Sequence, residues 1–189
     1  MSGSPRFTKG AFVYFASRRS RPKTIAFQYN PETLTRKIED EAVTSPGPRP
    51  GRARSTATPR QLIAFTLVLD ATEEPAAGLG VLPLISALEM LMYEGATAPG
   101  SVTLFVWGRN RIVPVRLREL HIVEQLFDSA LNPVRAEIAV TLSTRDRTDF
   151  AGAAWGRKYW DDYVAKAQEA AESAPGCTLA DLGLPHRPE

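Results

Sequence analysis

Apolar and polar residues alternate along several stretches of the chain, with the period of two that is typical of half-buried strands. The clearest case is residues 134–146, where every second residue from Val134 to Leu142 is apolar. Residues 61–71 are apolar on both faces of the expected strand, so we predict a central strand covered on both sides. Shorter alternating stretches predict further strands at residues 11–17, 24–29, 33–40, 101–108 and 112–127.

The longest of these stretches changes phase in its middle. The apolar positions of residues 112–127 are odd-numbered up to Leu117 and even-numbered from Leu120 onward. One extra residue in a strand shifts the alternation in this way. We therefore predict a β-bulge near Arg118-Glu119.

Two Asn-Pro dipeptides interrupt strand-like sequence, one in residues 27–40 and one in residues 127–140. Proline has no N–H to donate and holds the preceding residue in extended geometry, so a strand ladder must pause or bend there. We expect Leu34 and Ile38 to restart the first interrupted strand on the core face. The sequence thus predicts structural corners at Asn30, Pro31, Asn132 and Pro133.

Helical spacing replaces strand spacing at two places. In residues 81–93 the apolar positions recur every three or four residues, and Pro83 suits a first helical turn, which predicts a short amphipathic helix docked on a sheet. Residues 157–174 form the second predicted helix, which Pro175 and Gly176 end.

The order of these elements shows no alternation of strand, helix and strand. We therefore predict a mainly β (β+α) fold, an antiparallel β-barrel or split sandwich with one packed helix and a C-terminal helix. The length of 189 residues fits one sizeable domain, or one domain plus an appendage. We place the β-barrel domain at residues 1–150 and the C-terminal helix and tail at residues 151–189. Residues 42–60 are rich in Pro, Gly and Arg and predict a long loop within this domain.

Charge is distributed unevenly along the chain. Residues 1–60 carry twelve Lys and Arg against four Asp and Glu, whereas residues 161–189 carry two against six. Such asymmetry favours charge-complementary contacts with copies of the chain or with neighbouring proteins. Nucleic acid is a competing partner for the basic part, because cations and aromatic residues are interleaved in residues 12–23.

Candidate chemistry is sparse in this sequence. His121 and His186 are the two histidines, and neither has a partner at a metal-ligand spacing. The single cysteine, Cys177, rules out an intrachain disulfide, and adjacent carboxylates such as Asp161-Asp162 do not converge as an acid–base pair does. We predict no catalytic, cofactor-binding or metal-binding residues and no enzymatic activity. A small-ligand-binding barrel or an enzyme is the weaker alternative, because no polar cluster supports it.

No apolar run approaches the length that spans a bilayer, and the first residues lack the apolar segment of a signal peptide. The sequence therefore predicts a soluble, cytoplasmic protein.

Five motifs between residues 25 and 145 resemble the tube-type baseplate protein family of contractile injection systems, which are phage-tail-like particles. They are FQYNPETLTR, IAFTLVLDAT, GVLPLISALEMLMY, VTLFVWG and LHIVEQLFDSALNPVRAEIAVTLS, and they occur in the family's order. The resemblance implies a tail-tube-like β-barrel without enzymatic activity or cofactor. Many family members also carry a C-terminal LysM module that binds peptidoglycan, but no clear LysM module follows here.

The resemblance also implies an assembly. Copies of the chain are expected to form a homohexameric ring that acts as tube initiator or hub adaptor, joining the inner tube to the central spike of the baseplate. The expected partners are the inner tube protein, the spike protein and other baseplate subunits, with neither nucleic acid nor membrane. The protein would be assembled into an injection particle that is retained or released.

Basic and aromatic residues are the candidates for contacts between subunits. The aromatic ones also form a stripe with which the last helix could dock on the sheet, and both interpretations stay open. The alternative function is a nucleic-acid-binding β-barrel that uses the basic N-terminal half. The predicted subunit-interface residues are Arg18, Arg19, Arg21, Arg49, Arg52, Arg54, Trp155, Tyr159 and Trp160.

Overall fold

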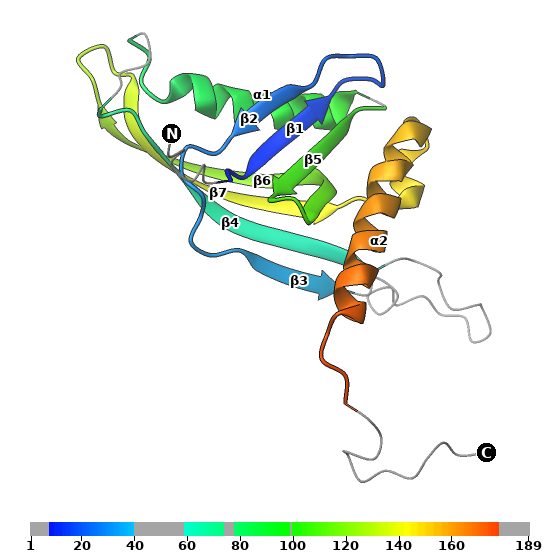
Figure 1. Ribbon diagram of the computed structural model, residues 1–189. Helices are drawn as coiled ribbons and strands as arrows, with labels where there is room; N and C mark the ends of the chain where they lie inside the picture. The colour runs from blue at the N-terminus through cyan, green and yellow to red at the C-terminus, as the bar shows by residue number, and fades with distance from the viewer. Residues whose placement is uncertain (1–7, 40–58, 74–77, 99, 178–189) are drawn as a thin grey trace, which may run out of the picture.

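The computed structural model describes residues 8–39, 59–73, 78–98 and 100–177. Seven strands of these residues form one antiparallel sheet in the order β2-β1-β5-β6-β7-β4-β3. The strands are β1 (Ala11–Phe15), β2 (Lys23–Ala26), β3 (Thr35–Glu39), β4 (Arg60–Asp70), β5 (Val102–Trp107), β6 (Arg111–Phe127) and β7 (Pro133–Thr144). Two helices, α1 (Leu82–Thr97) and α2 (Arg157–Glu172), complete the fold (Figure 1). The predicted mainly β class, with a packed helix and a C-terminal helix, is confirmed.

The sheet curls strongly around its core. In a flat sheet, four spacings of about 4.8 Å would separate β1 from β4 by roughly 19 Å. The ring centroids of Phe12 in β1 and Phe65 in β4 are nevertheless only 6.4 Å apart. Phe105 in β5 lies 5.3 Å from Phe65 and 6.1 Å from Phe12. The two halves of the sheet therefore face each other, and β2 and β3 remain as its edge strands.

Each helix covers a different face of the curled sheet. The buried residues of α1 are Ile85, Leu88 and Leu91, and they belong to the cluster of core residues that contains the phenylalanines inside the curl. Helix α2 packs on the opposite face of β1 and β5, in a second cluster built around Val102 and Phe150. The side chains of β7 alternate accordingly, with Ala136, Ile138, Val140 and Leu142 buried.

The structure corrects the prediction for the strand at residues 61–71. One face of β4 is buried, from Ile63 to Leu69, and the strand is paired on both sides, with β3 and β7. The other face is only half-buried and Thr66 on it is exposed, so within the described residues this face lacks full cover. A strand that is apolar on both faces is expected to be covered on both, but its composition does not show whether the covering residues belong to the same chain.

A second correction concerns β3. Leu34 packs against the core as predicted, but Ile38 is 62% exposed and every residue of β3 is exposed. This strand is the sheet edge beyond β4, and although Arg36 lines a cleft together with α2, neither helix buries a residue of β3. The predicted strand at 24–29 is also shorter than expected, because β2 ends at Ala26, before the Asn-Pro corner.

The β-bulge is confirmed, since the pairing of β6 with β7 shifts register between Leu117 and Glu119. The shift lets β6 bury odd-numbered residues before Arg118 and half-bury Leu120 and Ile122 after it. Two short 3₁₀ helices, Arg147–Phe150 and Ala154–Gly156, connect β7 to α2 and were not predicted.

Candidate interaction surfaces

The β6–β7 hairpin extends past the rest of the sheet and ends in an apolar tip (Figure 1). Four large apolar side chains are exposed there, which is more than the scattered single residues of an ordinary surface. We call this group the β6–β7 tip. Its members, with their exposed fractions, are Val123 (43%), Leu126 (61%), Phe127 (53%) and Leu131 (79%).

The turn of the β6–β7 tip is held by the side chain of Asp128. Its Oδ1 accepts hydrogen bonds from the backbone N–H groups of Ala130 and Asn132, both at 2.8 Å, and its Oδ2 accepts one from Asn132 Nδ2 at 3.0 Å. The hydrogen bonds from the Asn132 side chain and backbone hold the pKa of Asp128 below its usual range. The ionised carboxylate therefore organises the whole turn.

The predicted corner at Asn132-Pro133 joins this turn to the start of α1. Asn132 Nδ2 also donates to Gly78 O at 3.0 Å, and Val81 N donates to Pro133 O at 2.8 Å. Gly80 approaches so closely that a Cβ on it would lie 2.1 Å from Pro133 O. The hairpin base is thus fixed to the helix before the tip projects.

The other predicted corner fixes the entry to β1. Asn30 Oδ1 accepts a hydrogen bond from Gly10 N at 2.8 Å, and Asn30 Nδ2 donates to Thr8 O at 3.0 Å. Phe27 N donates to Gly10 O at 2.9 Å. Pro31, the residue after Asn30, is half-buried. In both corners the asparagine amide bonds to backbone that is distant in sequence, which the motif alone did not indicate.

An apolar groove of about 510 Å³ lies between the edge strand β2 and α1. We call it the β2–α1 groove. Its rim carries an ion pair in which Lys23 Nζ lies 2.8 Å from Glu94 Oε1 and 5.8 Å from the ring centroid of Tyr14. Burial, and then the Glu94 carboxylate, raise the pKa of Tyr14. Its apolar lining consists of Tyr14, Ile25, Pro83, Ala87, Met90 and Leu91.

The basic turn beside this groove is open to solvent. Arg18, Arg19 and Arg21 are all exposed in the connection between β1 and β2. The aromatic residues next to them are not available for stacking on bases, because Phe12 and Tyr14 are buried and the half-buried Phe15 packs against α2 and the segment before it. A single-strand nucleic-acid surface needs exposed rings among its cations, so the structure gives little support to the nucleic-acid alternative. Arg49, Arg52 and Arg54 lie outside the described residues.

The predicted aromatic interface residues pack inside the chain. The Phe15 ring of β1 contacts Trp155 at 5.8 Å and Tyr159 at 6.0 Å between centroids. Trp160 lies 5.8 Å from Tyr163, and all four aromatic side chains from Trp155 to Tyr163 are half-buried. This contact docks α2 on the sheet. A further role of Trp155, Tyr159 and Trp160 between subunits stays a prediction.

A second open cleft, of about 650 Å³, lies between α2 and the turn from β5 to β6. Trp107 and Tyr163 line it together with the cations Arg36, Arg111 and Lys166. Its Glu169 is the acidic lining residue, so the cleft is basic overall.

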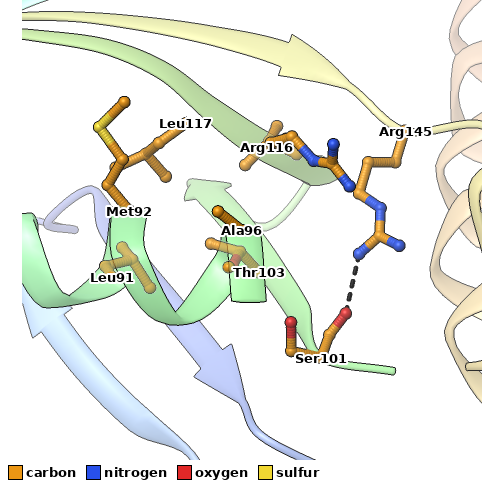
Figure 2. A pocket seen from close by; sticks show the side chains of 10 residues that line it. Leu91, Met92, Ala96, Ser101, Thr103, Arg116, Leu117 and Arg145 are labelled. Carbon is orange, nitrogen blue, oxygen red and sulfur yellow. Dashed lines mark hydrogen bonds between the residues drawn. The ribbon is translucent and has the colours of Figure 1, made fainter. Parts of the chain in front are cut away.

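A small cavity of about 70 Å³ lies near the buried end of Arg145 (Figure 2). The guanidinium donates to Ser101 O at 2.8 Å and to Asp149 O at 2.6 Å, and it lies 4.3 Å from the Phe150 ring centroid. Burial, and then the neighbouring Arg116, lower the pKa of Arg145. Figure 2 shows Arg116 of β6 alongside it. Arg145 thus ties the end of β7 to β5 and to the first 3₁₀ helix.

Within the described ranges, no group of three His, Cys, Asp or Glu side chains could hold a metal ion. His121 is exposed on β6. None of the helices in the part of the chain that the structure describes is long and apolar enough to cross a membrane.

Among the described residues, the two sheet edges have no further partner strand, an apolar tip projects and a groove lies open, which are features of an assembly subunit. The family model of the contractile injection system tube protein matches residues 12–151 of the chain. The chain belongs to this family, as its motifs predicted, and it has a structural tube-type role in a contractile injection particle. No curated protein sequence matches it.

Proposed function

We propose that this chain is a ring-forming adaptor of the baseplate, which initiates the inner tube and joins it to the central spike. The observation that carries the proposal is the open, curled sheet with the edge strands β2 and β3. Unpaired edges associate unless they are blocked, and a cyclic arrangement of copies satisfies both edges at once. The ring is a homohexamer, made in the cytoplasm, and its neighbours are the tube protein, the spike protein and other baseplate subunits.

Two features of the surface support contacts on several sides. The half-buried second face of β4, with Thr66 exposed, offers a wall toward the lumen or toward another subunit. The exposed cations Arg18, Arg19 and Arg21 stand at one end of the β1–β2 hairpin. The chain acts through these surfaces and not as an enzyme.

We place the ring-forming domain at residues 1–150 and treat residues 151–189 as an addition docked by α2. The extent of the family match, residues 12–151, supports this division. The Arg-rich segment at residues 42–60, which the sequence predicts as a loop, contacts neighbouring subunits or the next layer of the stack. Residues 42–58 of it lie outside the described residues, and Arg60 begins β4. A chain without residues 43–59 should therefore remain folded, by circular dichroism, and fail to restore particle assembly.

Removal of the chain from a particle-producing cell tests the adaptor function. We expect electron micrographs to show no complete particles, because the inner tube is neither initiated nor joined to the spike, and the wild-type chain supplied in trans should restore complete particles. Complete particles in cells that lack the chain would refute the proposal.

A further inference from the structure

Two leucines of the β6–β7 tip adopt a backbone conformation that leucine rarely takes. Leu126 has φ = 52° and Leu131 has φ = 63°, both in the left-handed region. Glycine and asparagine adopt this region readily, whereas a bulky L-residue is strained there. Both side chains are largely exposed, so within the described chain little burial compensates the strain. A partner that covers the side chains supplies that compensation.

The β6–β7 tip is also held in one conformation before any partner binds. Besides the contacts of the Asp128 carboxylate, Asp128 N donates to Asn132 O and Leu131 N donates to Asp128 O, both at 3.0 Å. A tip that is already ordered loses little conformational freedom on binding. The leucines are therefore presented as a preformed apolar projection.

The same chain provides a matching recess, the β2–α1 groove. The tip adjoins the start of α1, through Pro133 and Val81, whereas the groove runs along α1 from Pro83 to Glu94. At 1.5 Å per residue along a helix, Met90 and Glu94 lie roughly 14 and 20 Å along α1 from Val81. The hairpin extends past the start of α1 (Figure 1), so the tip does not lie in the groove of its own copy. Tip and groove can meet between copies.

The charges around the two surfaces are opposite. Residues 119–137 of the hairpin carry four acidic residues, Glu119, Glu124, Asp128 and Glu137, against the single Arg135. The β1–β2 hairpin beside the groove, residues 11–26, carries four cations and no acidic residue, and one of the four, Lys23, pairs with Glu94 of the groove. Complementary charge of this kind steers association and selects its orientation.

We propose that the β6–β7 tip of one copy seats in the β2–α1 groove of the next copy. Projection and recess are different surfaces, so the contact is heterologous and joins copies head to tail, which generates a ring when the rotation closes. The inference rests on the proposed ring and names the contact that builds it.

Glycine substitutions at the two strained positions test whether the leucines serve self-association or the stability of the monomer. In Leu126→Gly and Leu131→Gly the backbone strain is removed, so the melting temperature of the monomer should stay the same or rise. Loss of the apolar side chain should raise the apparent Kd of self-association about tenfold or more, measured by sedimentation velocity over a concentration series. Ser129→Gly, in the same exposed turn, controls for flexibility and should leave the Kd unchanged. An unchanged Kd in both leucine variants would overturn the inference.

Disulfide trapping locates the contact directly. In a Cys177→Ser background, Leu131→Cys combined with Met90→Cys should yield a ladder of cross-linked oligomers beyond the dimer under mild oxidation. Leu131→Cys combined with Thr66→Cys, an exposed residue away from the groove, should not. A dimer that forms with Leu131→Cys alone would mean that tip meets tip and would overturn the head-to-tail contact.

The two experiments also separate this inference from the proposed function. A wild-type chain that oligomerises without a link between positions 131 and 90 overturns the inference and leaves the ring standing. A wild-type chain that stays monomeric at the highest soluble concentration overturns both.

Discussion

Gln28 and Asp70 form a reciprocal pair across the open side of the curled sheet. Asp70 N donates to Gln28 Oε1 at 2.9 Å, and Gln28 Nε2 donates back to Asp70 O. The amide side chain thus takes the place of a neighbouring strand at the end of β4, where β3 no longer pairs with it. This contact joins the segment after β2 to the opposite half of the sheet.

Loss of the Gln28 amide should destabilise the fold. Gln28→Ala leaves one donor and one acceptor of Asp70 without their partner, which costs about 1–3 kcal/mol when such groups are partly buried. Urea unfolding followed by circular dichroism measures this change in the free energy of unfolding. Gln168→Ala, on the exposed surface of α2, is the matched control and should have almost no effect. Equal stability of the two variants would show that the pair does not hold the curl.

Two phenylalanines of the sheet should differ sharply on truncation. Phe105 is 0% exposed and its ring contacts Phe12 and Phe65, so Phe105→Ala leaves a cavity and should cost about 3–5 kcal/mol. Phe127 is 53% exposed at the β6–β7 tip, and Phe127→Ala should change monomer stability by less than about 1 kcal/mol. Chemical denaturation of both variants tests the position of the core. A large loss for Phe127→Ala would mean that the tip is folded into the monomer.

Gly80 should tolerate no side chain. It has φ = 54°, and a Cβ would lie 2.1 Å from the carbonyl oxygen of Pro133, which is backbone that cannot rotate away. Gly80→Ala should therefore lower the melting temperature by several degrees and loosen the hairpin base. Gly78→Ala is the control, because φ is also positive (76°) but a Cβ would meet nothing within 4 Å. Equal melting temperatures of the two variants would contradict this account, because they would show that the close approach of Gly80 to Pro133 does not require glycine.

Stability should fall in acid because three aspartates are held ionised. The pKa of Asp70 is lowered by hydrogen bonds from Thr72, and that of Asp128 by hydrogen bonds from Asn132. Burial alone would raise the pKa of Asp146, but hydrogen bonds from Thr148 outweigh it and lower the pKa. The folded pKa values lie below the unfolded ones, so the unfolded state binds more protons in acid.

The stabilisation from these carboxylates is therefore complete above about pH 4–5 and is lost as the pH falls through the lower, folded pKa values. Unfolding free energies measured between neutral pH and about pH 3 should decrease toward acid. Asp128→Asn should flatten the slope, because it removes the carboxylate whose pKa the Asn132 hydrogen bonds lower. A flat profile for the wild-type chain would contradict the bonding of these side chains.

The strand pattern in the sequence predicted most of the fold, because a strand with one buried face needs an apolar residue at every second position. The alternation of β7 and the phase slip of β6 both correspond to residues that face the core, so their positions were readable without partners. Ile38 shows the limit of this reasoning. Its strand alternates like the others, yet β3 is the edge of the sheet and every residue of it is exposed. Sequence periodicity reports a preferred face but not what lies against it.

The candidate surfaces were less predictable than the fold. Trp155, Tyr159 and Trp160 have the composition of an interface, but the structure uses them to dock α2 on Phe15. The β6–β7 tip was not predicted, because exposed Leu126 and Leu131 look like core residues in a list of apolar positions. Their positive φ angles and their exposure follow from the turn that Asp128 holds, and the sequence pattern does not show this turn. The Asn132-Pro133 dipeptide did, however, mark the place where that turn ends.

The position of the chain in the particle tests the central claim most directly. Electron microscopy of purified particles that carry a gold-labelled affinity tag on this chain measures that position. The proposed adaptor predicts label at the junction of tube and spike alone, with averaged end views that show a sixfold ring. Label distributed along the whole length of the tube would contradict the adaptor function, and particles without label would exclude the chain from the structure.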